Sequence, residues 1–273
     1  MTGIAPTVLG TLGSDDFRRA CAIVYDVAGI SMTDGKEGLV SSRLSKRMRE
    51  LGLGKYSDYL DLAERDSAEL AEMVDRLTTN KTNFFRENAH FEYLRDRILP
   101  ESGGRTLRIW SAGCSTGEEP YTIGMVLAEA TGGKPNVQML ATDISARVLT
   151  KAREALYLPE TLADVDPALV QRYFEPARSD ADGKRFRVRE SLRSLVKFAR
   201  LNLMDEWPMR GPFDVIFCRN VMIYFDRKTQ ERLVNRYYDL LAPGGTLFIG
   251  HSETLHAVEH SYAYRAPAVY VKA

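Results

Sequence analysis

The sequence predicts a two-part protein, in which a small all-α domain precedes an α/β domain built on a doubly wound, mostly parallel sheet. Three observations predict this fold. Residues 14–77 show helical periodicity only. Strand-like and helix-like segments then alternate over about 170 residues, a pattern typical of parallel sheets with helical crossovers. Finally, the run of small residues in "SAGCSTG" follows the first of these strands, where such folds bind ligands.

The N-terminal helices are indicated by apolar residues that recur every three or four positions. Ser14 is expected to cap the first helix, since hydroxyl side chains favour that position. One face of this helix is apolar, with Phe17, Ala20, Cys21, Val24 and Ala28. The later segment "GLGKYSDYLDLAERDSAEL" predicts a glycine break and two more short helices, and Asp66 with Glu69 resembles a capping box.

A second helix is predicted from Lys36 to Leu51, and one side of it is strongly basic. Its apolar positions are Val40, Leu44, Met48 and Leu51, and its basic positions are Arg43, Lys46, Arg47 and Arg49. Such a charged side is commonly only a solvated face. It could also hold an acidic partner, and the sequence leaves both interpretations open.

Three segments are expected along the chain: a helical domain over residues 1–77, a linker over 78–95, and the sheet domain over 96–273. The strands of the sheet domain are predicted at Leu107–Ser111, Val137–Thr142, Leu195–Asn202, Phe213–Cys218, Thr246–Gly250 and Val269–Lys272. An amphipathic helix from Asp226 to Leu241 is expected to end at "PGG", because glycine and proline stop helices.

An antiparallel β-hairpin is predicted within the sheet domain, over about residues 172–194. Its turn is indicated by Asp182–Gly183, a dipeptide that favours tight hairpin turns. Arg185, Arg187 and Arg189 alternate with other residues along one strand, so we expect them to share a face. They form a second candidate surface for an acidic partner.

Composition favours a cytoplasmic protein and agrees with a protein substrate. Lys plus Arg and Asp plus Glu both number 37, which gives a net charge of zero and argues against broad binding to nucleic acid. The three cysteines lie far apart, as expected for reduced thiols. The N-terminus lacks the basic and apolar regions of a secretory signal, and no apolar run is long enough to span a bilayer.

The turn after the first strand combines small residues with acids. Gly113 lets the backbone approach a ligand, but Glu118 and Glu119 lie where a helix N-terminus would bind phosphate. No Walker-type lysine is present, so a cationic ligand such as S-adenosylmethionine fits better. Asp143 ends the second strand, where an acid can accept ribose hydroxyls. Glu119 could simply complement the helix dipole, and Asp143 or Ser145 could cap the next helix.

Five stretches together resemble the chemotaxis receptor methyltransferases of the CheR type: "TNKTNFFRE", "WSAGCSTGEEPYTIGM", "ATDIS", "FDVIFCRNVMIYFD" and "LFIGHSE". The resemblance covers the chain from about residue 15 to its end. It implies a Rossmann-like S-adenosylmethionine methyltransferase sheet with a small inserted β-subdomain. It also implies methyl transfer to glutamate side chains in the cytoplasmic domain of methyl-accepting receptors, with S-adenosylhomocysteine as the other product.

The resemblance also implies roles for individual residues. Arg86 and Tyr224 match the residues that orient the substrate carboxylate, and form the predicted catalytic pair. The predicted cofactor-binding residues are Asn80, Thr82, Arg86, Gly113, Glu118, Asp143, Asn202, Leu203, Arg219 and Asn220. No metal is expected, and no general base is needed, because a glutamate is already ionised at neutral pH.

Three alternatives remain from the residues alone. "HAVEH" at 256–260 matches a zinc-protease pattern, but too few residues follow it to supply a helix with the third ligand. A methyltransferase acting on another substrate would share the sheet and the cofactor. A cofactor-binding module that tethers receptors without catalysis is the third, although the presence of both Arg86 and Tyr224 argues against it.

Overall fold

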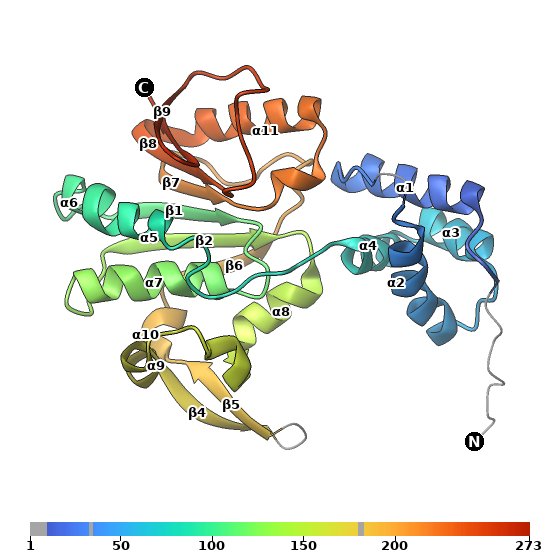
Figure 1. The fold of residues 1–273 in the computed structure, drawn as a ribbon, viewed down its shortest axis with the longest axis horizontal. Helices are drawn as coiled ribbons and strands as arrows, with labels where there is room; N and C mark the ends of the chain where they lie inside the picture. Colours follow the sequence, from blue (N-terminus) through green and yellow to red (C-terminus); the bar gives the residue numbers. More distant parts are fainter. Residues whose placement is uncertain (1–9, 33–34, 180–182) are drawn as a thin grey trace. The chain divides into compact units, whose positions relative to one another are not determined.

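The computed structural model describes residues 10–32, 35–179 and 183–273, which form two compact units. The first unit comprises the residues up to Thr79 together with Tyr224–Asp226. The second comprises Asn80–Ile223 and Arg227–Ala273. Figure 1 colours the chain from blue at the N-terminus to red at the C-terminus.

The first unit is all-α, as the sequence predicted. Its helices, blue to cyan in Figure 1, are α1 (Ser14–Ala28), α2 (Glu37–Glu50), α3 (Tyr56–Arg65) and α4 (Ser67–Leu77). The predicted apolar faces meet in one core, in which Val24, Leu44, Tyr59, Leu60 and Met73 are fully buried. Burial of these faces stabilises helices that would be marginal alone.

The two predicted helix starts have different outcomes. Ser14 does not cap α1: the N-cap residue is Gly13, and it makes no side-chain cap bond. Asp66 does cap α4, since its Oδ1 accepts the backbone N–H groups of Ala68 and Glu69. The Glu69 side chain does not complete the capping box, because its carboxylate binds a guanidinium of α2 instead.

The basic side of α2 is largely used within this unit. Arg43 donates from Nη1 to the carbonyls of Leu77 and Thr78, 2.7 and 2.9 Å away. Arg47 lies 2.6 Å from Glu69, and this contact holds the pKa of Glu69 below its usual value. Lys46 and Arg49 are exposed. Arg43 and Arg47 therefore stabilise the end of α4 and a buried carboxylate, and only part of the predicted basic surface faces solvent.

The second unit is a doubly wound sheet with strand order β6-β2-β1-β7-β8-β10-β9. Its strands are β1 (Leu107–Ala112), β2 (Val137–Asp143), β6 (Val196–Arg200), β7 (Phe213–Cys218), β8 (Leu241–Ile249), β9 (Tyr262–Ala266) and β10 (Val269–Lys272). The five strands from β6 to β8 in this order are parallel to one another, and β10 runs antiparallel to both β8 and β9. The strand order reverses at β1, which pairs with β2 on one side and β7 on the other. Ligands bind at such a switch point, outside the carboxyl ends of the strands.

Three helical elements of this unit precede β1, and the others lie between strands along the chain (Figure 1). They are α5 (Ala89–Tyr93), a π-helical turn (Leu94–Ile98), α6 (Leu99–Glu101), α7 (Glu118–Ala130), α8 (Ala146–Glu154), α9 (Pro167–Tyr173), α10 (Glu190–Arg193) and α11 (Arg227–Leu240), with 3₁₀ turns at Pro159–Leu162 and Met222–Tyr224. The 3₁₀ turn at Met222–Tyr224 spans the boundary between the two units, because its last residue, Tyr224, belongs to the first unit. The central strands bury Ile109, Trp110, Phe217 and Phe248 completely.

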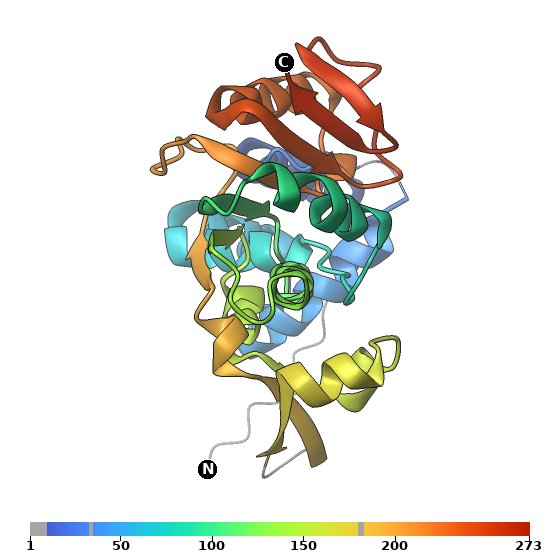
Figure 2. The ribbon, with the colours of Figure 1, turned by 90° about the vertical axis from the view of Figure 1, so that its left-hand side faces the viewer.

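A small antiparallel sheet is inserted between α8 and β6, as predicted. Its strands are β3 (Leu156–Tyr157), β4 (Phe174–Ser179) and β5 (Gly183–Val188), in the order β3-β5-β4 (Figures 1 and 2). The β4–β5 hairpin confirms the sequence prediction, although Asp182 of the predicted turn lies outside the described residues. Arg185 and Arg187 alternate in β5, but Arg189 lies beyond its end, at the N-cap of α10. The shared face therefore holds two of the three predicted arginines.

Two details of the main sheet differ from the sequence prediction. Strand β8 begins at Leu241, five positions before the predicted start at Thr246, so the "PGG" segment belongs to a strand. The register with β7 shifts there, because Leu241 pairs with Phe213 and Thr246 with Val215. The extra residues form an irregularity that the sheet accommodates as a bulge. Strand β9 was not predicted at all. Within the described ranges, no helix is long and apolar enough to cross a membrane.

Candidate functional site

The turn after β1 adopts backbone angles that favour glycine. Gly113 and Gly117 have φ of +89° and +97°. A Cβ on Gly113 would lie 2.4 Å from Val221 Cγ2, so no side chain fits there. The N–H groups of Gly113 and Cys114 both donate to the Thr142 carbonyl, 2.8 and 2.9 Å away. The turn is thereby held against the end of β2, where the predicted ribose acid lies.

Asp143 binds the turn directly. It is 7% exposed, and its Oδ2 accepts the N–H of Ser115 at 2.9 Å. Its Oδ1 accepts the N–H of Ser145, also at 2.9 Å. The cap of α8 is Ser145, whose Oγ accepts the N–H of Val148. The choice that the sequence left open between Asp143 and Ser145 is therefore settled, and the Asp143 carboxylate lies between two backbone turns.

Glu118 is a buried carboxylate at the start of α7. It is 4% exposed, and Thr116 Oγ1 donates to its Oε2 at 2.7 Å. Burial raises the pKa of Glu118, while the bond from Thr116 acts in the opposite direction. Among the residues that the structure describes, it forms no salt bridge. A buried carboxylate without a paired cation is costly, and a cationic ligand would remove that cost.

The linker residues reach the same turn. The Asn80 carbonyl accepts the Ser115 hydroxyl at 2.9 Å. Further along, the N–H of Phe85 donates to Thr122 Oγ1 on α7 at 3.2 Å. Thr82 and Arg86 are both half-buried, and Arg86 Nη1 donates to the carbonyl of Lys81 at 3.0 Å. Asn80 is thus joined to the turn, whereas Thr82 and Arg86 lie on the linker that follows.

Asn202 and Leu203 follow β6, next to the end of β2. The N–H of Leu201 donates to the Asp143 carbonyl at 3.0 Å, which places this pair at the same edge of the sheet. The Asn202 Oδ1 accepts the N–H of Met204 at 3.1 Å, and Leu203 is 9% exposed. The structure therefore brings together Asn80, Gly113, Glu118, Asp143 and the Asn202–Leu203 pair at one edge of the sheet.

Arg219 and Asn220 follow β7 directly and bind acidic residues nearby. The guanidinium of Arg219 binds Glu119, Glu87 and the carbonyl of Arg86. The Asn220 N–H donates to Glu253 Oε2 at 2.9 Å, and its side chain lies 3.4 Å from Glu87 Oε1. Both side chains therefore contact the linker.

Glu253 is a structural residue that sequence reasoning did not single out, although it ends the "GHSE" segment. Its carboxylate also accepts the N–H groups of Ile223 and Gly250. Burial raises its pKa, against the effect of these backbone bonds. Glu253 thereby fixes the turn that follows β7.

Tyr224, the second predicted catalytic residue, belongs to the helical unit. It is half-buried, and its carbonyl accepts the N–H of Ser31 at 2.8 Å. Arg86 belongs to the sheet unit. The two residues expected to orient the substrate are therefore contributed by different compact units.

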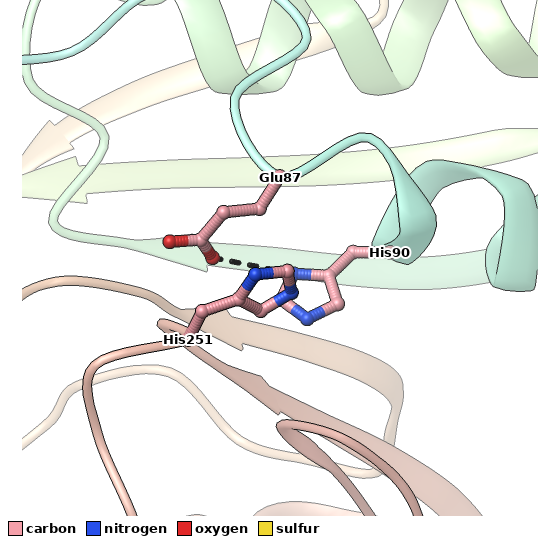
Figure 3. A group of neighbouring side chains, drawn as sticks. All are labelled: Glu87, His90 and His251. Atoms are coloured by element: carbon pink, nitrogen blue, oxygen red, sulfur yellow. Dashed lines mark ion pairs between the residues drawn. The ribbon is translucent and has the colours of Figure 1, made fainter.

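One cluster has the composition of a metal site. Glu87, His90 and His251 place their ligand atoms within 4.8 Å of one another (Figure 3). His90 Nδ1 lies 3.7 Å from Glu87 Oε2, too far for a hydrogen bond. However, Arg219 Nη2 already lies 3.1 Å from the same oxygen, so a divalent ion would face a guanidinium. This arrangement favours an ion pair with Arg219 over a metal centre.

The zinc-protease alternative is not supported by local structure. Residues 256–260 form turns and irregular structure instead of the helix that the motif requires. His260 Nδ1 accepts the N–H of Tyr262 at 3.2 Å. In the described part of the chain, the histidines of this segment do not join any cluster of three ligand side chains.

Two family models match the chain: the all-alpha domain of CheR methyltransferases over residues 15–78, and their SAM binding domain over residues 80–270. The chemotaxis protein methyltransferase of Escherichia coli K12 is 44% identical over 263 residues, covering 95% of this chain and 91% of that protein. The chemotaxis protein methyltransferase of Borreliella burgdorferi is 41% identical over 271 residues, covering 94% of each chain.

Proposed function

The chain belongs to the CheR methyltransferase family, and from this premise we propose that it transfers methyl groups from S-adenosylmethionine to glutamate side chains of methyl-accepting chemotaxis receptors. It is an S-adenosylmethionine-dependent methyltransferase, as the sequence predicted. The receptor substrate, the ester product and a cytoplasmic location are the proposed part. They are supported by relatives whose names connect them to chemotaxis, at high coverage of both chains.

The residues of the glycine turn fit the cofactor. When bound, S-adenosylmethionine supplies a methyl group activated by a sulfonium. Glu118 is the observation that carries the assignment, because its buried carboxylate can accept the cofactor's ammonium. Asp143 accepts a backbone N–H on each oxygen and ends β2, where an acid can accept ribose hydroxyls. Asn80 and the Asn202–Leu203 pair complete the proposed site.

The substrate carboxylate needs orientation rather than a base. A receptor glutamate is ionised at neutral pH, since its pKa is near 4.3. In the proposed mechanism, Arg86 binds one carboxylate oxygen and leaves the other free, and Tyr224 fixes the angle of approach.

The test is incubation of the purified protein with radiolabelled S-adenosylmethionine and receptor-containing membranes. We expect label on the receptors that is released as methanol by mild base, as methyl esters are. Arg86→Ala should lose transfer by orders of magnitude while it still binds the cofactor. Base-stable label, or label on another class of molecule, would show a methyltransferase of different specificity. Cofactor binding without any transfer would favour a tethering module.

A further inference from the structure

Arg219 is a buried arginine whose two terminal guanidinium nitrogens both have hydrogen-bond partners. Its side chain is 2% exposed, and it follows β7 directly. Nη1 donates to Glu119 Oε2 at 2.9 Å, and Nη2 lies 3.1 Å from Glu87 Oε2 and donates to the carbonyl of Arg86. The guanidinium also lies over the ring of Phe91, 5.2 Å from its centroid. The planar guanidinium group, held by these contacts, has little freedom to rotate.

The linker around Arg86 adopts a conformation that needs support. Phe85 and Glu87 have φ of 55° and 56°, in the left-handed region that disfavours residues with a Cβ. Such a conformation costs on the order of 1–2 kcal/mol per residue and persists only where neighbours hold it. The Phe85 N–H is held by Thr122 on α7. Arg219 holds the other side, through the Arg86 carbonyl and the Glu87 side chain. These two attachments hold the backbone on both sides of Arg86.

Glu119 connects this support to the sheet. Its Oε1 accepts the Ser111 hydroxyl at 2.7 Å, and Ser111 is fully buried in β1. Its Oε2 accepts the guanidinium of Arg219, and the Glu119 side chain is only 12% exposed. Glu119 therefore does more than complement the dipole of α7. A continuous path of hydrogen bonds runs from Ser111 through Glu119 and Arg219 to the backbone of Arg86.

We propose that Glu119 and Arg219 are positioning residues, which fix the linker backbone so that Arg86 is presented to the substrate carboxylate. This inference rests on the proposed function, in which Arg86 binds that carboxylate. In this inference, the negative charge of Glu119 serves to hold the linker through Arg219 and does not bind the cofactor. It also explains why a second acid follows Glu118 at a helix N-terminus that needs only one for a cationic ligand.

The test is a double-mutant cycle between Glu119→Gln and Arg86→Lys. Gln keeps the size of Glu119 and an acceptor for Ser111, but removes the charge that holds Arg219. A misplacement of about 1 Å can lower a rate by about 10²-fold, so we expect kcat to fall 10- to 100-fold. The Kd for S-adenosylmethionine should change by less than about threefold. In the Arg86→Lys background, Glu119→Gln should add less than a twofold further loss, since contacting residues are non-additive.

Two further variants keep the test decisive. Ser111→Ala removes only the hydroxyl that anchors Glu119, and should cause a smaller loss of kcat that also disappears in the Arg86→Lys background. Glu101→Gln, at an exposed position of α6, is the matched control and should leave kcat unchanged. Folding of each variant is followed by tryptophan fluorescence.

Three results would overturn the inference: an unchanged kcat in Glu119→Gln, losses that multiply independently with Arg86→Lys, or a loss of cofactor affinity as large as the loss of kcat. If the wild-type protein does not label receptors, the proposed function itself fails. If it labels them and the losses multiply, only the positioning role fails.

A zinc titration checks the ion pair between Glu87 and Arg219. Zinc added to the wild-type protein should not bind with micromolar affinity. Zinc binding that is lost in His251→Ala would mean that Glu87 belongs to a metal site and not to an ion pair with Arg219.

Discussion

At the scale of single residues, Glu118 combines a cost to the free protein with a role in binding. Its carboxylate is buried, and this burial raises its pKa. Natural sites commonly retain such unfavourable groups for function. Glu118→Gln keeps the size and the bond from Thr116, but removes the charge. We therefore expect the stability of the ligand-free protein to rise and its affinity for S-adenosylmethionine to fall.

The variant Glu118→Gln should raise the free energy of unfolding of the ligand-free protein by about 0.5–2 kcal/mol. It should also weaken S-adenosylmethionine binding by about 10- to 100-fold, because a hydrogen bond to a charged group contributes roughly 1.5–3 kcal/mol. Thermal unfolding and calorimetric titration measure the two effects. A less stable variant with unchanged affinity would mean that Glu118 only complements the helix dipole.

The residues that could be predicted are those whose chemistry is local in sequence. Gly113, Glu118 and Asp143 follow directly from strand ends, and the structure brings them together. The partners of Arg219 could not be predicted, because Glu87 and Glu119 lie more than 90 positions away along the chain. Glu253 was missed for the same reason: its acceptor role depends on backbone N–H groups presented by a turn after another strand.

At the scale of elements, the sequence predicts those with strong periodicity and misses the short ones. The four N-terminal helices and the β4–β5 hairpin have clear apolar patterns or turn signals. Strand β3 has two residues and is ordered by pairing with β5, which no local pattern reveals. The early start of β8 is hidden because "PGG" is a helix-stop signal, whereas its place in a sheet depends on pairing with β7.

The basic side of α2 gives a prediction at this scale. Arg43→Ala should lower the free energy of unfolding of the helical unit by about 1–3 kcal/mol, since it leaves two carbonyls at the end of α4 without their donor. Lys46→Ala, on the same helix but exposed, should change it by less than about 0.5 kcal/mol. Equal effects of the two variants would show that the contacts of Arg43 are not stabilising.

Urea unfolding followed by far-UV circular dichroism makes this comparison. Both tryptophans, Trp110 and Trp207, belong to the sheet unit, so their fluorescence reports that unit separately. The change caused by Arg43→Ala should appear mainly in the circular dichroism signal. Receptor KM, measured in parallel, separates the two interpretations of the surface: docking through α2 would raise KM in Lys46→Ala without any change in stability.

At the scale of the whole molecule, zero net charge hides buried groups that respond to pH in opposite ways. Burial, and then the charge of Arg219, lowers the pKa of His90 to about 3. The ring is fully buried against Phe248, beside His251 and Glu87. Burial raises the pKa values of Glu118 and Glu253. Compared with the unfolded chain, the folded state therefore protonates His90 only at lower pH, and it protonates Glu118 and Glu253 at higher pH.

The sign of each contribution follows from comparison with the unfolded chain. A histidine there has a pKa near 6.5, so below that pH the unfolded state binds a proton that folded His90 refuses until about pH 3. The stability that His90 contributes is complete above pH 6.5 and is lost as the pH falls. Glu118 and Glu253 act oppositely: the folded state gains stability from them as the pH falls through their raised pKa values towards about 4.3. The net curve of the wild-type protein is therefore shallower than His90 alone would give.

The variant His90→Phe isolates the histidine, because it leaves both carboxyls in place and puts an aromatic ring beside Phe248. Between pH 6 and 4.5, its free energy of unfolding should fall less steeply than that of the wild-type protein, by about 1.4 kcal/mol per pH unit. Urea unfolding followed by tryptophan fluorescence at several pH values measures this slope. The slope, and not the absolute stability, is the readout, so a packing cost of the phenyl ring does not affect the comparison. His256→Gln, at an exposed position, should give a curve parallel to the wild type. If the His90→Phe curve is also parallel, folded His90 takes up its proton as readily as an exposed histidine, and neither its burial nor the charge of Arg219 keeps it neutral.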